Sequence, residues 1–183
     1  MNEAGGMEIS YANHPQVEDL IARLIGHVEQ IALQFDRWEH PHVFGPGLYL
    51  ALVVGPSIDS YADPMGDNRW PDEAPVNVLA DSDGFHEALD EIAYERDGAL
   101  VISVDGVVLP QFVRFLSTDV DQSRDYADWM GSRHMSALDI STRQDVVATL
   151  TLSQESGRIT VFKNGSYETT ERTQLGAPWR GVE

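Results

Sequence analysis

The feature that most constrains the fold of this chain is an uninterrupted apolar run at residues 48–54, Leu-Tyr-Leu-Ala-Leu-Val-Val. Glycine and proline bracket it, as Gly-Pro-Gly at 45–47 and Gly-Pro at 55–56. A strand with one face in water alternates apolar and polar residues, whereas an unbroken run of this length is typical of a strand covered on both faces. The rest of the chain is therefore expected to supply elements that pack on both sides of a sheet.

Helices and further strands are predicted on either side of this run. Apolar residues at spacings of three and four predict one amphipathic helix from Pro15 to about Trp38. A second helix is expected from a cap at Ser82 or Asp83 to the turn at Asp97, and a short one over 136–142. Strands are predicted at 99–104, 107–116, 146–152 and 158–162, with hairpin turns at Asp-Gly 105–106 and Asn-Gly 164–165.

This order of elements predicts an α/β fold, a twisted mixed β-sheet with helices packed around it. We expect a single domain over residues 15–170, preceded by a mobile arm at 1–14 and followed by a polar tail at 171–183. Residues 57–83 are rich in proline and aspartate with little periodicity, so they are expected to form a long surface insertion.

The charge balance limits the partners of the chain. It has 30 acidic residues against 12 basic ones, for a net charge of −18, and Lys163 is its single lysine. Nucleic acids and anionic lipids are bound by clustered cations, so neither is expected as a partner. Dispersed acidity with almost no lysine favours a halophilic source, where salt screens self-repulsion; an ordinary acidic cytoplasmic protein is the alternative.

Composition also limits the chemistry and the location. The chain has no cysteine, so any metal must be held by carboxylates, imidazoles or the phosphates of a ligand. No apolar run approaches the roughly 20 residues that span a bilayer, and residues 1–10 do not resemble a signal peptide. We therefore expect a soluble, cytoplasmic protein without a membrane partner.

Three short polar segments follow predicted helices or strands. They are Asp-Gly-Ala at 97–99, Gly-Ser-Arg-His-Met-Ser-Ala at 131–137 and Ser-Gln-Glu-Ser-Gly at 153–157. The middle segment combines small residues with a guanidinium and an imidazole, which suits an anion with several oxygens. On its own it would also fit a solvated loop that enters a helix.

Taken together, the order and spacing of these segments resemble the diadenylate cyclase domain family, the nucleotide-binding domain of the DNA-integrity scanning protein and its relatives. The resemblance covers residues 82–165, and residues 17–54 fit it in pattern; with the acidic composition it suggests an archaeal halophilic member. It implies a twisted mixed sheet wrapped by helices that binds one ATP per subunit. It also implies a face-to-face homodimer in which the 3′-hydroxyl of each ATP attacks the α-phosphorus of the other, giving cyclic di-AMP and two pyrophosphates.

The resemblance also implies roles for individual residues. Asp97 would act at a Mg2+ or Mn2+ ion and at the attacking hydroxyl, and Glu155 would be a second metal ligand. Small neighbours at Gly98 and Ala99 would let the nucleotide approach the backbone. The residues expected to bind the phosphates are Gly131, Ser132, Arg133, His134 and Ser153. The main chain of a strand at Arg114, Phe115 and Leu116 would contact the adenine.

Three positions depart from the family pattern. Met135 stands where many members have a second arginine, Arg96 where some have a histidine ligand, and Gln154 where an acidic residue is usual. Arg96 could restore the charge that Met135 withdraws. The leading hypothesis is an active cyclase. The alternatives are a catalytically impaired module that binds ATP or cyclic di-AMP as a sensor or partner subunit, and an unrelated interaction domain that does not bind ATP.

Overall fold

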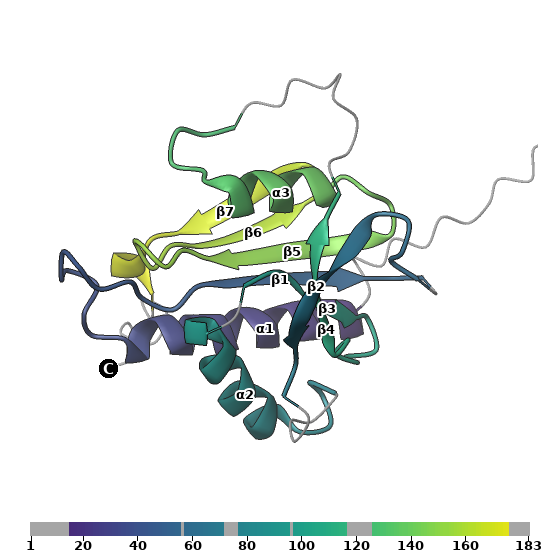
Figure 1. Cartoon of the computed structure of the whole chain (residues 1–183), viewed down its shortest axis with the longest axis horizontal. Coiled ribbons are helices and arrows are strands. Elements are labelled where there is room, and N and C mark those ends of the chain that lie inside the picture. Colours follow the sequence, from purple (N-terminus) through teal and green to yellow (C-terminus); the bar gives the residue numbers. More distant parts are fainter. Residues whose placement is uncertain (1–14, 56, 72–76, 96, 117–125, 176–183) are drawn as a thin grey trace, which may run out of the picture.

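A five-stranded mixed sheet forms the centre of the fold, with strand order β3-β1-β5-β6-β7 (Figure 1). The computed structural model describes residues 15–55, 57–71, 77–95, 97–116 and 126–175. β1 pairs parallel with β3 and antiparallel with β5, and the remaining pairs are antiparallel. The strands are β1 (Leu48–Val53), β3 (Leu100–Ser103), β5 (Val146–Leu152), β6 (Ile159–Lys163) and β7 (Ser166–Thr170). The expected α/β fold with a mixed sheet is confirmed.

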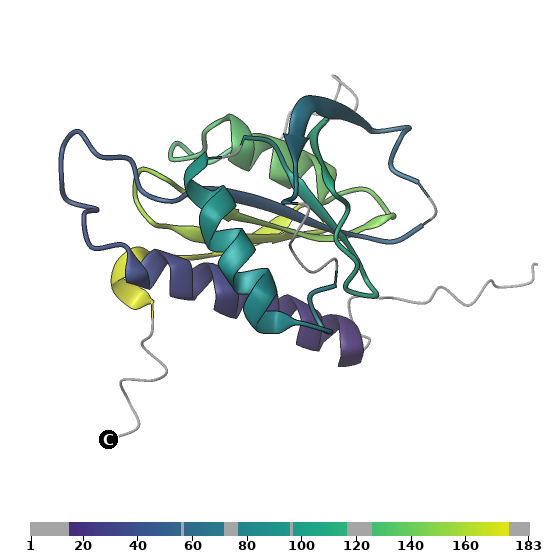
Figure 2. The same cartoon turned by 60° about the horizontal axis from the view of Figure 1, so that its bottom comes forward.

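Both faces of β1 are covered, as its unbroken apolar sequence predicted. All six of its residues are buried. Leu48, Leu50 and Leu52 pack with residues of α1 (Pro15–Gln34) and α2 (Ser82–Glu95), which lie on one side of the sheet in both views (Figures 1 and 2). Tyr49, Ala51 and Val53 face the other side, in a second cluster with residues of α3 (Ser132–Ile140). The sheet is therefore the middle layer of three.

The helices differ from expectation at their ends. α1 ends at Gln34, short of the expected Trp38. α2 begins at Ser82, and its first turn is capped by Asp81, whose Oδ1 accepts the N–H of Gly84 at 3.0 Å, so the predicted caps at Ser82 and Asp83 are wrong. α3 begins at Ser132 and not at 136, which places Ser132, Arg133 and His134 in its first turn.

The predicted hairpin of strands at 99–104 and 107–116 is only partly correct. The Asp105-Gly106 turn is present, with Gly106 at φ +83, and Val108 bridges to Ile102. The chain then passes Pro110, which has no N–H to donate, and leaves the sheet. Residues Gln111–Phe115 form β4, which pairs antiparallel with β2 (Ala62–Arg69) in a separate two-stranded sheet.

The segment 57–83 is consequently not the structureless insertion that its composition predicted. It supplies β2, and Tyr61 and Trp70 at the two ends of that strand are buried. β2 contains a proline, a glycine and two aspartates and is largely exposed, so it has no alternating pattern to reveal it. Residues 72–76 of this segment lie outside the described part of the chain.

The end of the chain also contributes to the core. After β7, a short 3-10 helix, η2 (Arg172–Gln174), leads to Leu175, which is 2% exposed and packs on the α1 side of the sheet. The expected arm at 1–14 and the residues from 176 onward lie outside the described residues. Within the described part, no helix has the length and apolar content needed to cross a membrane.

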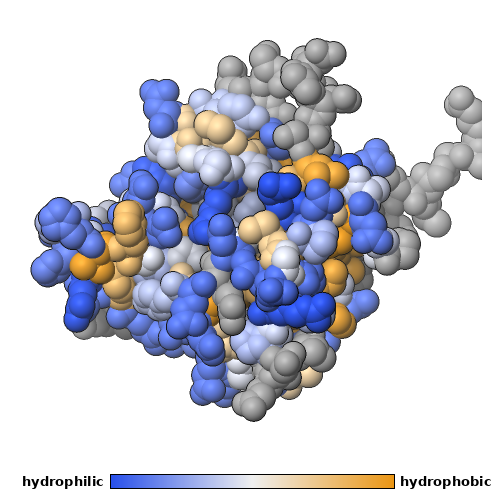
Figure 3. All heavy atoms as spheres, in the orientation of Figure 1, coloured by the Kyte–Doolittle hydropathy of each residue, from blue (hydrophilic) through white to orange (hydrophobic). Residues whose placement is uncertain are grey.

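Hydrophilic side chains cover most of the face presented in Figure 1, and hydrophobic ones are scattered among them (Figure 3). This agrees with the dispersed acidity of the sequence.

Candidate functional site

Two adjoining cavities bring the three polar segments together. The larger, of about 560 Å³, is lined by residues of all three segments, including Asp97, Arg133 and Glu155. The smaller, of about 310 Å³, shares Asp97, Ser132 and Arg133 with it. Volumes of this size fall within the range of small-molecule sites. The sequence segments 97–99, 131–137 and 153–157 therefore meet at one place, although the chain separates them.

The N-terminus of α3 opens onto both cavities. Gly131 is the N-cap residue, in an extended conformation with φ −86 and ψ −172, and as a glycine it has no side-chain oxygen to cap the helix. The first amides of a helix have no carbonyl partner within it, and they carry the positive end of its dipole. Because Ser132 and Arg133 line both cavities, these amides are available to an anion there.

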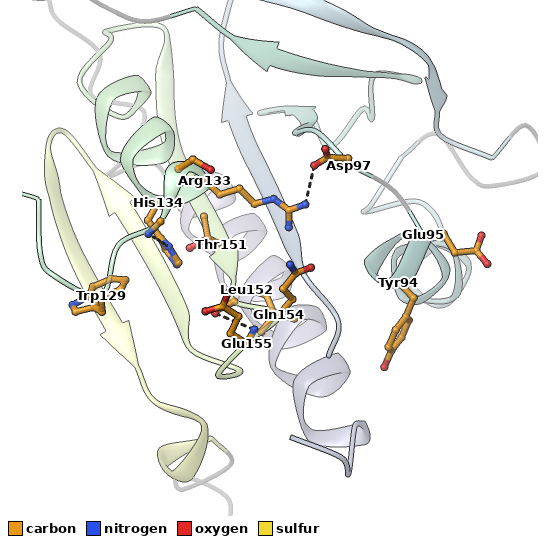
Figure 4. Close-up of a pocket in the computed structure, with 13 residues that line it drawn as sticks. Tyr94, Glu95, Asp97, Trp129, Arg133, His134, Thr151, Leu152, Gln154 and Glu155 are labelled. Atoms are coloured by element: carbon orange, nitrogen blue, oxygen red, sulfur yellow. Dashed lines mark hydrogen bonds and ion pairs between the residues drawn. The ribbon is translucent and has the colours of Figure 1, made fainter. Parts of the chain in front are cut away.

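Arg133 is paired with Asp97 across the opening of the site. Its Nη2 lies 2.9 Å from Asp97 Oδ1, which also accepts the N–H of Gly98 at 2.9 Å. The hydrogen bond from Arg133 and that from Gly98 hold the pKa of Asp97 below its usual value. Figure 4 shows the guanidinium extended from α3 toward the carboxylate. Gly98 itself has φ +98, which favours glycine.

Gly47, which belongs to none of the three polar segments, leaves space for the side chain of Arg133. A Cβ at Gly47 would lie 2.9 Å from Arg133 Nη1 and 3.1 Å from the Cβ of Gln154. The loop of Gly47 is fixed between two other elements, since Gly45 N–H donates to Gln154 O at 2.8 Å and Gly47 N–H to Ala93 O at 2.9 Å. The Gly-Pro-Gly sequence before β1 was the signal for this close approach.

His134 lines the larger cavity and has a buried ring nitrogen, Nε2. Its Nδ1 accepts the N–H of Gly131 at 3.3 Å, so the proton of the neutral ring is on Nε2. Burial, with Arg158 and Arg133 nearby, lowers the pKa of His134, which favours the neutral ring. Nε2 is buried and has no hydrogen-bond partner among the described residues. A buried donor of this kind is costly unless a ligand or water accepts from it.

Thr151 is a second buried donor in the same cavity. It is 2% exposed, lies on β5 and lines the larger cavity, and its Oγ1 also has no partner among the described residues. Thr149, two residues earlier on the same strand, donates its hydroxyl to Ala137 O at 2.9 Å. Two residues that line this cavity beside a helix N-terminus therefore each have a buried donor without a partner among the described residues, a combination that suits an oxyanion.

The loop between β5 and β6 forms the side of the larger cavity that carries Glu155. Ser153 Oγ accepts the N–H groups of Glu155 and Ser156, both at 3.4 Å, and so shapes the turn. Glu155 is exposed and lines the same cavity as Asp97, and Figure 4 places it away from the Asp97–Arg133 pair. Among the described residues, no three His, Asp or Glu side chains lie together as a metal cluster.

The smaller cavity is the more apolar of the two. Of the strand predicted to contact adenine, Arg114 and Phe115 line this cavity, whereas Leu116 is 40% exposed and is not among the lining residues. Ala99 of the Asp-Gly-Ala segment lines it as well. Reciprocal hydrogen bonds between Ala99 and Val113, at 2.8 and 3.0 Å, tie the Asp-Gly-Ala segment to β4. Tyr49 and Ser136 complete the wall, with their hydroxyls 2.9 Å apart.

Comparison with known proteins identifies the family. The family model described as DisA bacterial checkpoint controller nucleotide-binding, abbreviated DAC, matches residues 75–167. The chain belongs to the DAC family. A search of the curated proteins finds no match to the sequence.

Solved structures confirm the DAC-like fold. A double mutant of DacA from Staphylococcus aureus superposes with a TM-score of 0.54 and 18% identity, covering 88% of this chain and 96% of that one. A hypothetical membrane spanning protein from Bacillus cereus gives a TM-score of 0.56 with 15% identity, covering 82% of this chain. The match extends over 63% of that protein, so the chain spans less than two thirds of its length.

Of the three residues that depart from the DAC pattern, the structure describes Met135 and Gln154. Met135 is 37% exposed and is not among the residues that line either cavity. Gln154 lines the larger cavity. Arg96 lies outside the described residues. The prediction that its charge replaces the one missing at Met135 therefore stays a prediction.

Sequence reasoning did not select several residues that line the larger cavity of this DAC domain. Tyr94 and Glu95 come from the end of α2, Trp129 from the loop before α3, and Thr151 from β5. Each resembles an ordinary helix, loop or strand residue in the sequence.

Proposed function

We propose that the chain is a diadenylate cyclase that condenses two ATP molecules into cyclic di-AMP and two pyrophosphates across a face-to-face homodimer. The observation that carries this proposal is that His134 and Thr151, whose buried Nε2 and Oγ1 have no hydrogen-bond partner among the described residues, line the same cavity as Asp97 and Arg133. Membership of the DAC family supports it.

The two cavities suit the two halves of a nucleotide. The larger one offers a guanidinium, helix amides and hydroxyls, so it would hold the triphosphate, with Ser132, Arg133, His134 and Ser153 around it. The smaller one, lined by Ala99, Val113 and Phe115, would hold the adenosine. Asp97, which lines both, would then lie near the ribose and the α-phosphate, where the reaction takes place.

The electrostatics of Asp97 favour one role over another. A general base works best when its pKa is close to the working pH, and the pKa of Asp97 lies below its ordinary value. Asp97 is therefore suited to stay ionised, accept a hydrogen bond from the 3′-hydroxyl and ligate a cation. The hydrogen bonds that Arg133 and Gly98 donate to it both end on Oδ1.

Asp97 and Glu155 fit a hard divalent cation by the nature of their donor atoms. Both offer carboxylate oxygens to the larger cavity. Two carboxylates do not complete the coordination of Mg2+ or Mn2+, so phosphate oxygens and water would supply the remaining ligands. When bound, such an ion would neutralise negative charge on the phosphates.

The reaction requires two copies of the site. The 3′-oxygen of one ATP forms a bond to the α-phosphorus of the other, the bond from that phosphorus to the bridging β-oxygen breaks, and pyrophosphate leaves while the hydroxyl proton passes to solvent. A second transfer with the roles exchanged closes the ring. Asp97 orients the hydroxyl, and Arg133, the α3 amides and the buried donors hold the phosphates in line.

One observation favours the alternative, a binding module without catalysis. Among the described residues that line the larger cavity, Glu95, Asp97 and Glu155 are acidic and Arg133 is the only arginine. A triphosphate with about four negative charges meets more repulsion there than a cyclic dinucleotide with two. The test is chromatography of the products made from ATP with Mg2+ or Mn2+, at several salt concentrations. Cyclic di-AMP supports the cyclase, and tight nucleotide binding without product supports the module.

A further inference from the structure

Arg158 places a further positive charge behind Trp129, a residue that lines the larger cavity. Arg158 closes the loop that contains Ser153 and Glu155, because Ser153 N–H donates to Arg158 O at 2.9 Å. Its guanidinium carbon lies 4.3 Å from the centre of the Trp129 ring, a stacked cation–π arrangement. Trp129 lines the larger cavity and meets the ring of His134 edge-on at 5.1 Å between centroids.

The charge of Arg158 affects the pKa of His134. After burial, Arg158 is the largest cause of the lowered pKa of His134, ahead of Arg133, its neighbour in the chain. The unpaired Nε2 of His134 is one of the two buried donors of the cavity. The field of Arg158 therefore acts where the phosphates are proposed to lie.

The present partner of Arg158 holds it weakly. Its Nη2 lies 3.3 Å from Glu171 Oε1, in a single contact, and the Glu171 side chain is 61% exposed while that of Arg158 is 20% exposed. One-point ion pairs of this kind at a surface contribute little, so a multiply charged ligand can displace the carboxylate. Arg158 also lines a small cavity of about 160 Å³ with Ser156, Arg172 and Thr173, which leaves space around its head group.

We infer that Arg158 is a second phosphate-binding cation of this site, which leaves Glu171 and turns across Trp129 to contact the terminal phosphate of the bound nucleotide. The inference rests on the proposed entry of a nucleotide into the larger cavity, and it adds the means by which this chain selects a triphosphate over a monophosphate. It also adds a second guanidinium to the site, since Arg133 is the only arginine among the described residues that line the cavity.

The test measures the affinity of the whole chain for ATP and for AMP by calorimetry, at fixed salt. Arg158→Gln is expected to weaken ATP binding about tenfold and to leave AMP binding unchanged, because a charged hydrogen bond to the terminal phosphate is lost. Arg158→Lys keeps the charge and should retain part of the affinity. Arg23→Gln is the matched control, since Arg23 also pairs with one carboxylate, that of Asp19 on the surface of α1.

Glu171→Gln gives a prediction of opposite sign. Removing the competing carboxylate frees Arg158, so ATP should bind roughly two- to fivefold more tightly, and AMP as before. If Glu171 had only a structural role, its loss would weaken binding of both nucleotides or change neither.

The outcomes separate this inference from the proposed function. Unchanged ATP affinity in Arg158→Gln, or an equal loss for ATP and AMP, overturns the inference while the cyclase proposal stands on its product assay. A selective loss for ATP in a protein that makes no cyclic di-AMP supports the inference and sinks the cyclase. Absence of ATP binding by the unaltered chain overturns both.

Discussion

Arg133 Nη2 and Asp97 Oδ1 lie 2.9 Å apart, so the guanidinium proposed to hold phosphate is paired with the carboxylate proposed to hold the metal. The two side chains come from α3 and from the turn after α2, which are far apart in the sequence. A nucleotide with its cation would separate the pair, since each partner gains a ligand of opposite charge. The ion pair thus holds both side chains in position in the unliganded site.

Loss of Arg133 should therefore affect both the ligand and Asp97. In Arg133→Gln, ATP affinity is expected to fall by about ten- to a hundredfold through the lost contacts to phosphate. The pKa of Asp97 should rise toward its ordinary value, because the largest cause of its lowering is gone. Calorimetry and a carboxyl NMR titration would measure the two effects; an unchanged Asp97 titration would contradict the pairing.

Thr151 and Thr149 form a matched pair on β5. Thr151→Val removes a buried hydroxyl that has no partner among the described residues, so stability should be unchanged or slightly higher while ATP affinity falls about tenfold. Thr149→Val removes a hydroxyl bonded to Ala137 O, so stability should fall by about 1 kcal/mol with ATP affinity retained. Urea unfolding and calorimetry distinguish the two, and a reversed pattern would rule out Thr151 as a ligand contact.

Gly47 tests the space that Arg133 occupies. Gly47→Ala places a Cβ 2.9 Å from Arg133 Nη1, so we expect the guanidinium to move and cyclic di-AMP formation to fall. Gly26→Ala on α1 is the control: its new Cβ meets nothing within 4 Å, and alanine should stabilise the helix by about 0.5–1 kcal/mol. Full activity in Gly47→Ala would show that the close approach has no role.

Stability should depend on pH through a histidine pair between α1 and α2. His27 Nδ1 lies 3.0 Å from His86 Nδ1, and Ser82 Oγ lies 3.1 Å from His27 Nε2. Burial, His86 and Arg23 lower the pKa of His27 from 6.5, and Asp83 opposes them. The unfolded chain then binds more protons than the folded one as the pH falls through about 6.5, so this contribution to stability is present above that pH and lost below it.

The measurement is the urea midpoint from pH 8 to pH 5. The unaltered chain should lose stability below about pH 6.5, and His27→Gln should lose less over the same interval. His42→Gln, at an exposed turn position, is the control and should follow the unaltered chain. Parallel curves for His27→Gln and the unaltered chain would assign the pH dependence to other groups.

The parts of the fold that the sequence predicted well are those whose burial is complete or strictly periodic. β1 and β5 are covered on both faces, with an unbroken apolar sequence in β1 and a largely apolar one in β5, and α1 has one continuous stripe toward the sheet. β2 escaped prediction because its residues are mostly exposed and its conformation depends on pairing with β4, more than 40 residues later. Pairing partners far along the chain leave no local pattern.

The candidate site divides in the same way. Asp97, Arg133 and Glu155 belong to short polar segments whose order and spacing resemble the motifs of the DAC family, and this resemblance selected them from the sequence. Thr151 lies inside a buried strand, and only the three-dimensional structure shows that it lines a cavity and that its hydroxyl has no partner among the described residues. Gly47 matters because the side chain of Arg133 lies close to it in space, and no motif in the sequence links these two residues.

The most direct test of the central proposal compares Asp97→Asn with Asp19→Asn in the formation of cyclic di-AMP from ATP. Each aspartate is paired with one arginine at 2.9 Å, Asp97 with Arg133 in the site and Asp19 with Arg23 on α1, so the two changes remove equivalent charges. We predict that Asp97→Asn abolishes product formation while still binding ATP, and that Asp19→Asn retains full turnover. Equal turnover in the two variants would contradict the assignment of Asp97 as the residue that orients the reacting groups.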